Sequence, residues 1–232
     1  MYDQNDTNVS DANRAVCQTH VNVYNCPSDT EVQTLGQPAS GPARYAYAFS
    51  SYRAMCGRSN GHIGVVPQGG WWDGYEYQDI ANKGWRGVLH VVGPGTSATY
   101  GGGALDCERF STVKDGTSTT LAVGELHRPI KGSQEIPTRG TFWAYSYTSY
   151  NASDACPYSS TLLANDWARC RDGVPGRNDN FCKRGWGSYH AGIVNFAMVD
   201  GAVNSIPVTI DINLFCAMAS IMGGEPAYIP GR

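Results

Sequence analysis

The chain has 232 residues, of which 41% are hydrophobic and only 16% are charged, and its formal net charge is -3 at pH 7. With a sequence pI of about 5.9, it has no basic field to attract nucleic acid or anionic lipid, so neither partner is expected. Its 28 glycines and 14 tyrosines favour a secreted, β-rich protein with long loops over a helical cytosolic enzyme.

The first expected strand covers residues 21–26, a short alternating segment. Pro27 fixes its own backbone angle, and Ser28 and Asp29 favour a turn, so the strand must end there. A second strand is expected within residues 43–52, where Tyr and Phe alternate with small residues.

Glycine recurs through residues 56–105, so this segment is expected to form loops with short strands, for example residues 87–92. Asp115 and Gly116 give a turn signal, and residues 117–125 after it are expected to form a buried strand. Residues 139–150 are expected to form a further strand with three aromatic side chains on one face.

Residues 151–187 show little periodicity and are interpreted as a disulfide-pinned surface insertion. A β-hairpin is expected over residues 193–206, with Asp200 and Gly201 as a two-residue turn of type I′. Asp211 is expected to cap a helix over residues 212–222, where apolar residues recur at helical spacing.

The eight cysteines are even in number and scattered, and none forms the C-x-x-C pair of ordinary structural zinc sites. The pattern therefore predicts about three disulfides or more in an oxidising compartment. Local bridges are plausible within two pairs, Cys17 with Cys26 and Cys170 with Cys182. The cysteines expected to form disulfides are Cys17, Cys26, Cys56, Cys107, Cys156, Cys170, Cys182 and Cys216.

Three short blocks resemble the DUF1559 family of secreted pilin-like proteins. They are Cys-Pro-Ser-Asp at 26–29, the 115–125 block that ends in Gly124 and Glu125, and His190 nine residues before Asp200-Gly201. The family motif residues, for which a structural role is expected, are Cys26, Pro27, Ser28, Asp29, Asp115, Gly116, Gly124, Glu125, His190, Asp200 and Gly201.

The resemblance implies an α+β, pilin-like fold: one head domain over residues 1–232, with an antiparallel β-sheet and long disulfide-stapled loops. It also implies that a prepilin-type leader and an apolar polymerising helix precede this chain. The implied role is an extracellular structural or adhesive subunit of a type IV pilus-like or type II secretion-like filament, with other pilins as partners. An extracellular glycan- or solute-binding module is the alternative, and a secreted enzyme is the less favoured one.

His190 and Asp200 are the obvious chemical pair, but an extended strand would place them about 20 Å apart or more, so they cannot share an ion. His190 is expected to hold the entry of the hairpin through hydrogen bonds. Glu125 and His127 could face the same way as i and i+2 residues of a strand, yet a surface strand-edge pair is the favoured interpretation.

Two further sites are candidates. The candidate cofactor is calcium, because hard oxygen ligands cluster on a loop with glycines. A solvated disulfide loop without an ion is the simpler interpretation of the same residues. Its candidate ligands are Asp172, Asn178, Asp179 and Asn180. Aromatic residues could form a sugar-stacking platform, with sheet core or subunit contact as the alternative. The candidate platform residues are Trp71, Trp72, Tyr75, Trp143, Tyr145 and Tyr147.

Overall fold

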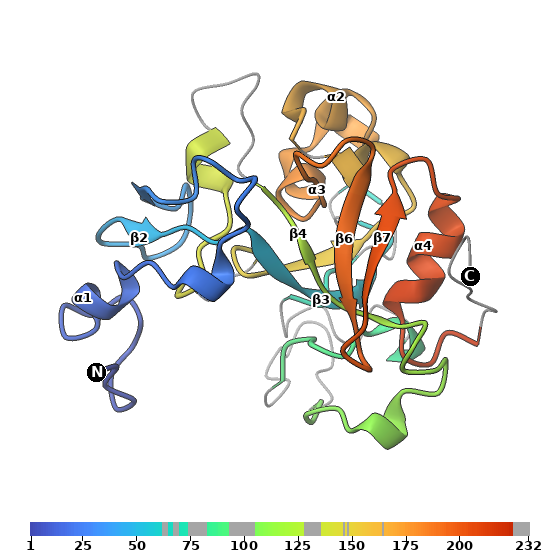
Figure 1. Cartoon of the computed structure of the whole chain (residues 1–232), viewed down its shortest axis with the longest axis horizontal. Helices are drawn as coiled ribbons and strands as arrows, with labels where there is room; N and C mark the ends of the chain where they lie inside the picture. The colour runs from blue at the N-terminus through green and yellow to red at the C-terminus, as the bar shows by residue number, and fades with distance from the viewer. Residues whose placement is uncertain are drawn as a thin grey trace.

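The fold is known from a computed structural model of the chain. It describes residues 1–61, 65–66, 70–73, 83–92, 105–127, 136–145, 147, 149–163 and 165–224. The described part has mixed α+β content, with a five-stranded sheet at its centre (Figure 1). Among the helices described, none is long and apolar enough to cross a bilayer.

The main sheet has the strand order β5-β3-β4-β6-β7, and a small two-stranded sheet pairs β1 with β2. The strands are β1 (Leu35–Gly36), β2 (Tyr47–Ala48), β3 (Tyr52–Arg58), β4 (Leu121–Glu125), β5 (Ala152–Ala155), β6 (Ile193–Met198) and β7 (Val203–Pro207). The α-helices are α1 (Arg14–Cys17), α2 (Trp167–Asp172), α3 (Asp179–Lys183) and α4 (Ile212–Ala219). Short 3₁₀ turns cover Asn22–Tyr24, Lys83–Trp85, Phe110–Thr112, Ile136–Arg139, Ser159–Leu163 and Pro175–Arg177.

The expectation of a wholly antiparallel sheet is wrong at one edge, because β5 runs parallel to β3. The chain leaves β4 beside one side of β3 and returns as β5 on the other side. Parallel neighbours need a long connection, and here the chain between β3 and β5, which includes β4, supplies it. The pairs β3–β4, β4–β6 and β6–β7 are antiparallel.

The main core lies between the sheet and α4. Along β6 the buried residues Val194, Phe196 and Met198 alternate with partly exposed ones, and the buried set packs against Phe215 and Met218 of α4. Since side chains of a strand alternate between its two faces, the other β6 residues, Asn195 among them, face away from α4. This second face carries the site described below.

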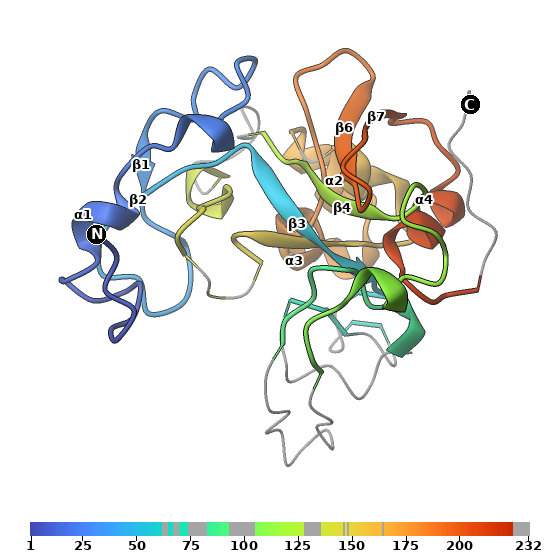
Figure 2. The same cartoon turned by 60° about the horizontal axis from the view of Figure 1, so that its bottom comes forward.

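The helix prediction is confirmed with one shift: α4 ends at Ala219, three residues before the expected Met222. The Asp211 side chain accepts a hydrogen bond from the backbone N–H of Asn213 at 2.8 Å and so caps the helix. Figures 1 and 2 place α4 on one side of the main sheet and the first fifty residues on the opposite side.

A second core, made mainly of aromatic side chains, lies in the N-terminal part of the fold. The strands predicted over residues 21–26 and 139–150 are wrong here. Residues 22–24 form a 3₁₀ turn. In the other segment a 3₁₀ turn ends at Arg139, and a single bridge at Phe142 and a turn follow it. The rings of Phe142 and Phe49 stack at 4.5 Å, and Tyr145 approaches Tyr47 at 4.8 Å. Packing of ring against ring therefore decides this backbone, not strand pairing. Residues 87–92, a third expected strand, form a turn and irregular chain.

Residues 151–187 are not the surface insertion that their sequence suggested. All four residues of β5 are buried within the main sheet, and Phe181 and Trp186 are fully buried. The disulfide between Cys170 and Cys182 joins α2 to α3. Part of the segment is thus core, which short helices and a disulfide hold in place.

Cys170–Cys182 is the one disulfide among the eight cysteines, all of which lie in described residues. The expected bridge between Cys17 and Cys26 is absent. The Cys17 thiol instead donates to the Asn8 carbonyl at 3.6 Å. The thiols of the structure are Cys17, Cys26, Cys56, Cys107, Cys156 and Cys216, and of these Cys107 alone is exposed.

The β6–β7 hairpin is confirmed, but its turn differs from the expected one. The N–H of Gly201 donates to the Met198 carbonyl at 3.0 Å, and the N–H of Met198 donates to the Ala202 carbonyl at 2.7 Å. Three residues therefore form the loop. Gly201 has a φ of 86°, whereas Asp200 is not among the residues with positive φ. A type I′ turn needs positive φ at both central residues, which only glycine adopts at no steric cost.

Candidate functional site

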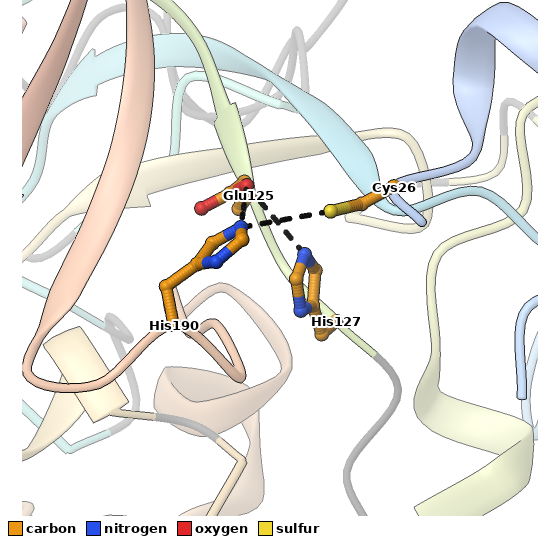
Figure 3. A group of neighbouring side chains, drawn as sticks. All are labelled: Cys26, Glu125, His127 and His190. Atoms are coloured by element: carbon orange, nitrogen blue, oxygen red, sulfur yellow. Dashed lines mark hydrogen bonds and ion pairs between the residues drawn. The ribbon is translucent and has the colours of Figure 1, made fainter. Parts of the chain in front are cut away.

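One residue from each of the three family-like blocks meets at a single place, on the sheet face away from α4. Cys26 follows the first 3₁₀ turn, Glu125 ends β4, and His190 precedes β6 (Figure 3). The Cys26 Sγ lies 3.6 Å from His190 Nε2, and His190 Nε2 lies 3.2 Å from Glu125 Oε1. His127 completes the group, whose ligand atoms all lie within 4.8 Å of one another. We call these four residues the motif cluster.

Glu125 is the anionic centre of the motif cluster. Its Oε2 accepts from the backbone N–H of Asn195 at 2.7 Å, and its Oε1 accepts from the Asn195 side-chain amide at 3.2 Å. Burial by itself would raise the pKa of Glu125, but the nearby His127 imidazole and the hydrogen bonds from Asn195 outweigh it and lower the pKa to about 2. The carboxyl group is therefore ionised at neutral pH, although it is buried.

His127 is fixed in one tautomer by its neighbour. The backbone N–H of Tyr189 donates to His127 Nδ1 at 3.0 Å, so Nδ1 must be the acceptor and the proton lies on Nε2. That Nε2 lies 3.6 Å from Glu125 Oε1. The sequence interpretation of Glu125 and His127 as a surface pair is wrong, because both side chains are buried.

His190 does not have the geometry of a proton relay. In a Cys-His-acid triad, one ring nitrogen faces the thiol and the other faces the acid. Here Nε2 alone faces both Cys26 and Glu125. The His190 side chain is 30% exposed, and its backbone N–H donates to Ser188 Oγ at 3.0 Å. The cluster can bind a proton or a cation between its members, but this arrangement does not activate a nucleophile by relay.

A pocket of about 470 Å³ opens beside the motif cluster. Cys26, Glu125, His190 and Asn195 form its polar end, and mainly apolar side chains from the sheet and from Pro27 line the remainder. The other lining residues are Ser28, Tyr52, Val123, Phe196, Ala197 and Val203. Burial, followed by the nearby Cys26 and Glu125, raises the pKa of Tyr52 to about 12, so its hydroxyl stays protonated.

Other motif residues join chain segments. The Asp115 carboxylate accepts from the backbone N–H groups of Gly223 and Gly224, at 2.8 and 3.3 Å. Asp29 accepts from Ser51 Oγ at 2.9 Å. Asp200 accepts from the backbone N–H of Ala202 at 2.9 Å, within the hairpin loop. Gly116 has a φ of 97° and occupies the turn before β4.

The aromatic platform does not assemble. Trp71, Trp72 and Tyr145 are each at most 1% exposed and belong to the core. Trp143 is half-buried, and its indole N–H donates to the Thr19 carbonyl at 3.0 Å. Tyr147 is exposed, and Tyr75 lies outside the described residues. Buried rings cannot stack on a glycan, so the prediction of a sugar-stacking platform is wrong for Trp71, Trp72 and Tyr145.

The calcium candidates turn toward different protein partners. Asp172 forms an ion pair with Arg177 at 2.6 Å, and Asn178 caps α3 by accepting from the backbone N–H of Asn180 at 2.9 Å. Asp179 accepts from the indole N–H of Trp167 at 3.3 Å. Calcium requires several oxygens that converge on one point, so an ion here would have to displace these contacts.

Fold and site together define a mixed-sheet α+β protein in which three short motifs meet at one pocket. The model of the family SBP_bac_10, described as "Protein of unknown function (DUF1559)", matches residues 1–213, and the chain belongs to this family. No curated protein and no solved structure matches the chain.

Sequence reasoning found Cys26, Glu125 and His190 as motif residues but missed that they meet. The available signal was that each of the three blocks contains one residue that can ligate or titrate. Asn195, the partner of Glu125, carries no motif signal of its own, because the pairing of β6 with β4 places it.

Proposed function

We propose that this chain is the head of an extracellular, pilin-like filament subunit that acts by surface contact and not by turnover. Membership of the DUF1559 family and the low content of charged residues support this role. The disulfide between Cys170 and Cys182 agrees with an exported protein.

The observation that carries the proposal is the role of the motif residues. Glu125 joins β4 to β6 through Asn195, Asp115 joins the turn before β4 to the chain after α4, and Asp29 reaches Ser51 beside β3. A family signature of this kind maintains a head fold.

Immunogold electron microscopy on intact cells of the source organism tests this function. Antibodies raised against this chain are expected to label filaments along their length and to detect the protein in the fraction sheared from the cell surface. Cells that lack the gene provide the control. Label confined to the cell interior would reject the filament role. Label on a cell surface without filaments, together with absence of the protein from the sheared fraction, would also reject it.

Binding of a small solute is a second candidate, because the pocket beside the motif cluster combines an apolar lining with a polar end. Pockets of this size and character commonly hold small molecules. Thermal shift against a library of small organic acids and sugars tests it. A stabilising compound should lose its effect when Val123 is changed to Phe, which narrows the pocket, and retain it when the exposed Val92, which does not line the pocket, is changed to Phe.

A further inference from the structure

We infer that Cys26 Sγ, Glu125 Oε1 and His190 Nε2 bind a divalent transition-metal ion of the zinc type, with a fourth coordination position open to the pocket. This inference is independent of the filament role, since it concerns one site in the head. It revises the expectation that His190 is purely structural. That expectation rested on the separation of His190 from Asp200, whereas the structure supplies Glu125 and Cys26 as partners.

The distances between the donor atoms fit one ion. Tetrahedral zinc with bonds of about 2.0–2.1 Å to N and O and about 2.3 Å to S separates neighbouring ligand atoms by roughly 3.3–3.6 Å. The observed separations are 3.6 Å for Cys26 Sγ to His190 Nε2 and 3.2 Å for His190 Nε2 to Glu125 Oε1. The third separation, from Cys26 Sγ to Glu125 Oε1, is within 4.8 Å, so shifts of about 1 Å or less in these side chains would bring all three atoms around one ion.

The types of the donor atoms select the class of metal. A thiolate, an imidazole nitrogen and a carboxylate oxygen form a mixed soft and hard set, which favours zinc, cobalt or nickel over calcium and magnesium. Two anionic ligands would also balance the charge of a divalent ion. This balance matters because Cys26 and Glu125 are 5% and 2% exposed, and a buried charge is costly unless a partner compensates it.

His127 acts as a positioning residue and not as a ligand. The N–H of Tyr189 holds the lone pair of Nδ1, so the proton on Nε2 prevents that atom from binding an ion. It points instead toward the Glu125 carboxylate at 3.6 Å, while Asn195 binds both carboxylate oxygens. Metal-ligating carboxylates are typically oriented by such hydrogen bonds from outer residues.

The fourth position would face the pocket. Both the pocket lining and the partial exposure of His190 leave this side of the motif cluster accessible to water or to a small anion. In zinc proteins, three protein ligands with a fourth position left to water or substrate are typical of catalytic sites, whereas structural sites are closed by four protein ligands. An ion bound here would also tie together three segments that are far apart in the chain, at residues 26, 125 and 190.

Cobalt titration tests the site directly. The reduced protein, stripped with a chelator, is titrated with Co²⁺, because a thiolate ligand gives a sulfur-to-cobalt charge-transfer band and tetrahedral geometry gives intense visible bands. One equivalent is expected to saturate both, and Zn²⁺ should remove them. Cys26→Ser should abolish the charge-transfer band. His190→Gln and Glu125→Gln should weaken Co²⁺ binding by more than the roughly 10- to 100-fold that is typical when only an outer residue is changed.

Matched controls separate ligands from bystanders. Cys107→Ser removes the exposed thiol, and His20→Gln removes a histidine outside the motif cluster, so both variants should bind Co²⁺ as the wild type does. His127→Gln should keep the charge-transfer band but weaken binding. Circular dichroism confirms that each variant is folded. The inference is overturned if the folded wild type shows no thiolate–cobalt band, or if the band survives Cys26→Ser or disappears with Cys107→Ser.

Discussion

Cys26 Sγ lies 3.6 Å from His190 Nε2, although 164 positions separate the two residues in the chain. Glu125 at the end of β4 lies between their segments and contacts His190 at 3.2 Å. The main sheet therefore brings three motifs of the DUF1559 family into one cluster. The stability of the protein should depend on this cluster and on the buried polar contacts around it.

The ionised Glu125 should make the protein sensitive to acid. Its folded-state pKa of about 2 lies below the usual 4.5, so its contribution to stability is fully present above pH 4.5 and is lost as the pH falls toward 2. Urea unfolding at a series of pH values should show that Glu125→Gln has lost this part of the pH dependence. Asp211→Asn, at an exposed helix cap, should retain it. Equal acid sensitivity of wild type and Glu125→Gln would contradict the prediction.

Two ion pairs should differ strongly in how much they contribute to the free energy of unfolding. Arg184 binds both oxygens of the buried Asp73, at 2.9 and 3.1 Å, and Asp73→Ala would leave a buried guanidinium without its carboxylate. We expect a loss of about 3–5 kcal/mol in the free energy of unfolding. Asp172→Ala breaks the exposed pair with Arg177 and should cost about 1 kcal/mol or less. Denaturant unfolding measures both. Similar losses in the two variants would show that burial of the first pair is incorrect.

Gly124 should tolerate no side chain. A Cβ atom there would lie 2.2 Å from the Phe196 ring and 2.8 Å from Trp186. Gly124→Ala should therefore destabilise the protein by about 1–3 kcal/mol through overpacking. Adding Phe196→Leu removes the ring and should make the Gly124→Ala change less costly. A double-mutant cycle from thermal or urea unfolding measures this coupling. Additive effects of the two changes would refute the close packing.

The Cys170–Cys182 disulfide should stabilise the α2–α3 pair. It closes a loop with a sequence separation of 12, so the double change to Ala should cost about 2–4 kcal/mol. Cys107→Ser should have no comparable effect on the unfolding midpoint. Alkylation under denaturing, non-reducing conditions, read by intact mass, should label the 6 free cysteines. Fewer labelled thiols would restore the sequence expectation of further disulfides.

Some elements could be predicted from the sequence because their signals are local. The β6–β7 hairpin follows from alternating side chains around Asp200 and Gly201, and α4 follows from helical spacing after an Asp cap. The strand β4 also lies within its predicted block. In each case the pattern that buries the apolar side chains and the residues that end the element are within a few positions of each other.

The remaining features required the tertiary structure, because distant contacts decide them. The alternating aromatics at 143–147 suit a strand, yet rings from residues 45–49 draw Tyr145 into a core of turns. Nothing local marks β5 as the parallel neighbour of β3, since that pairing depends on how the chain crosses the sheet. The sequence by itself determined the family and the local elements. Only the folded sheet decided that Cys26, Glu125 and His190 meet, because strand order and register set the distance between residues that the chain keeps far apart.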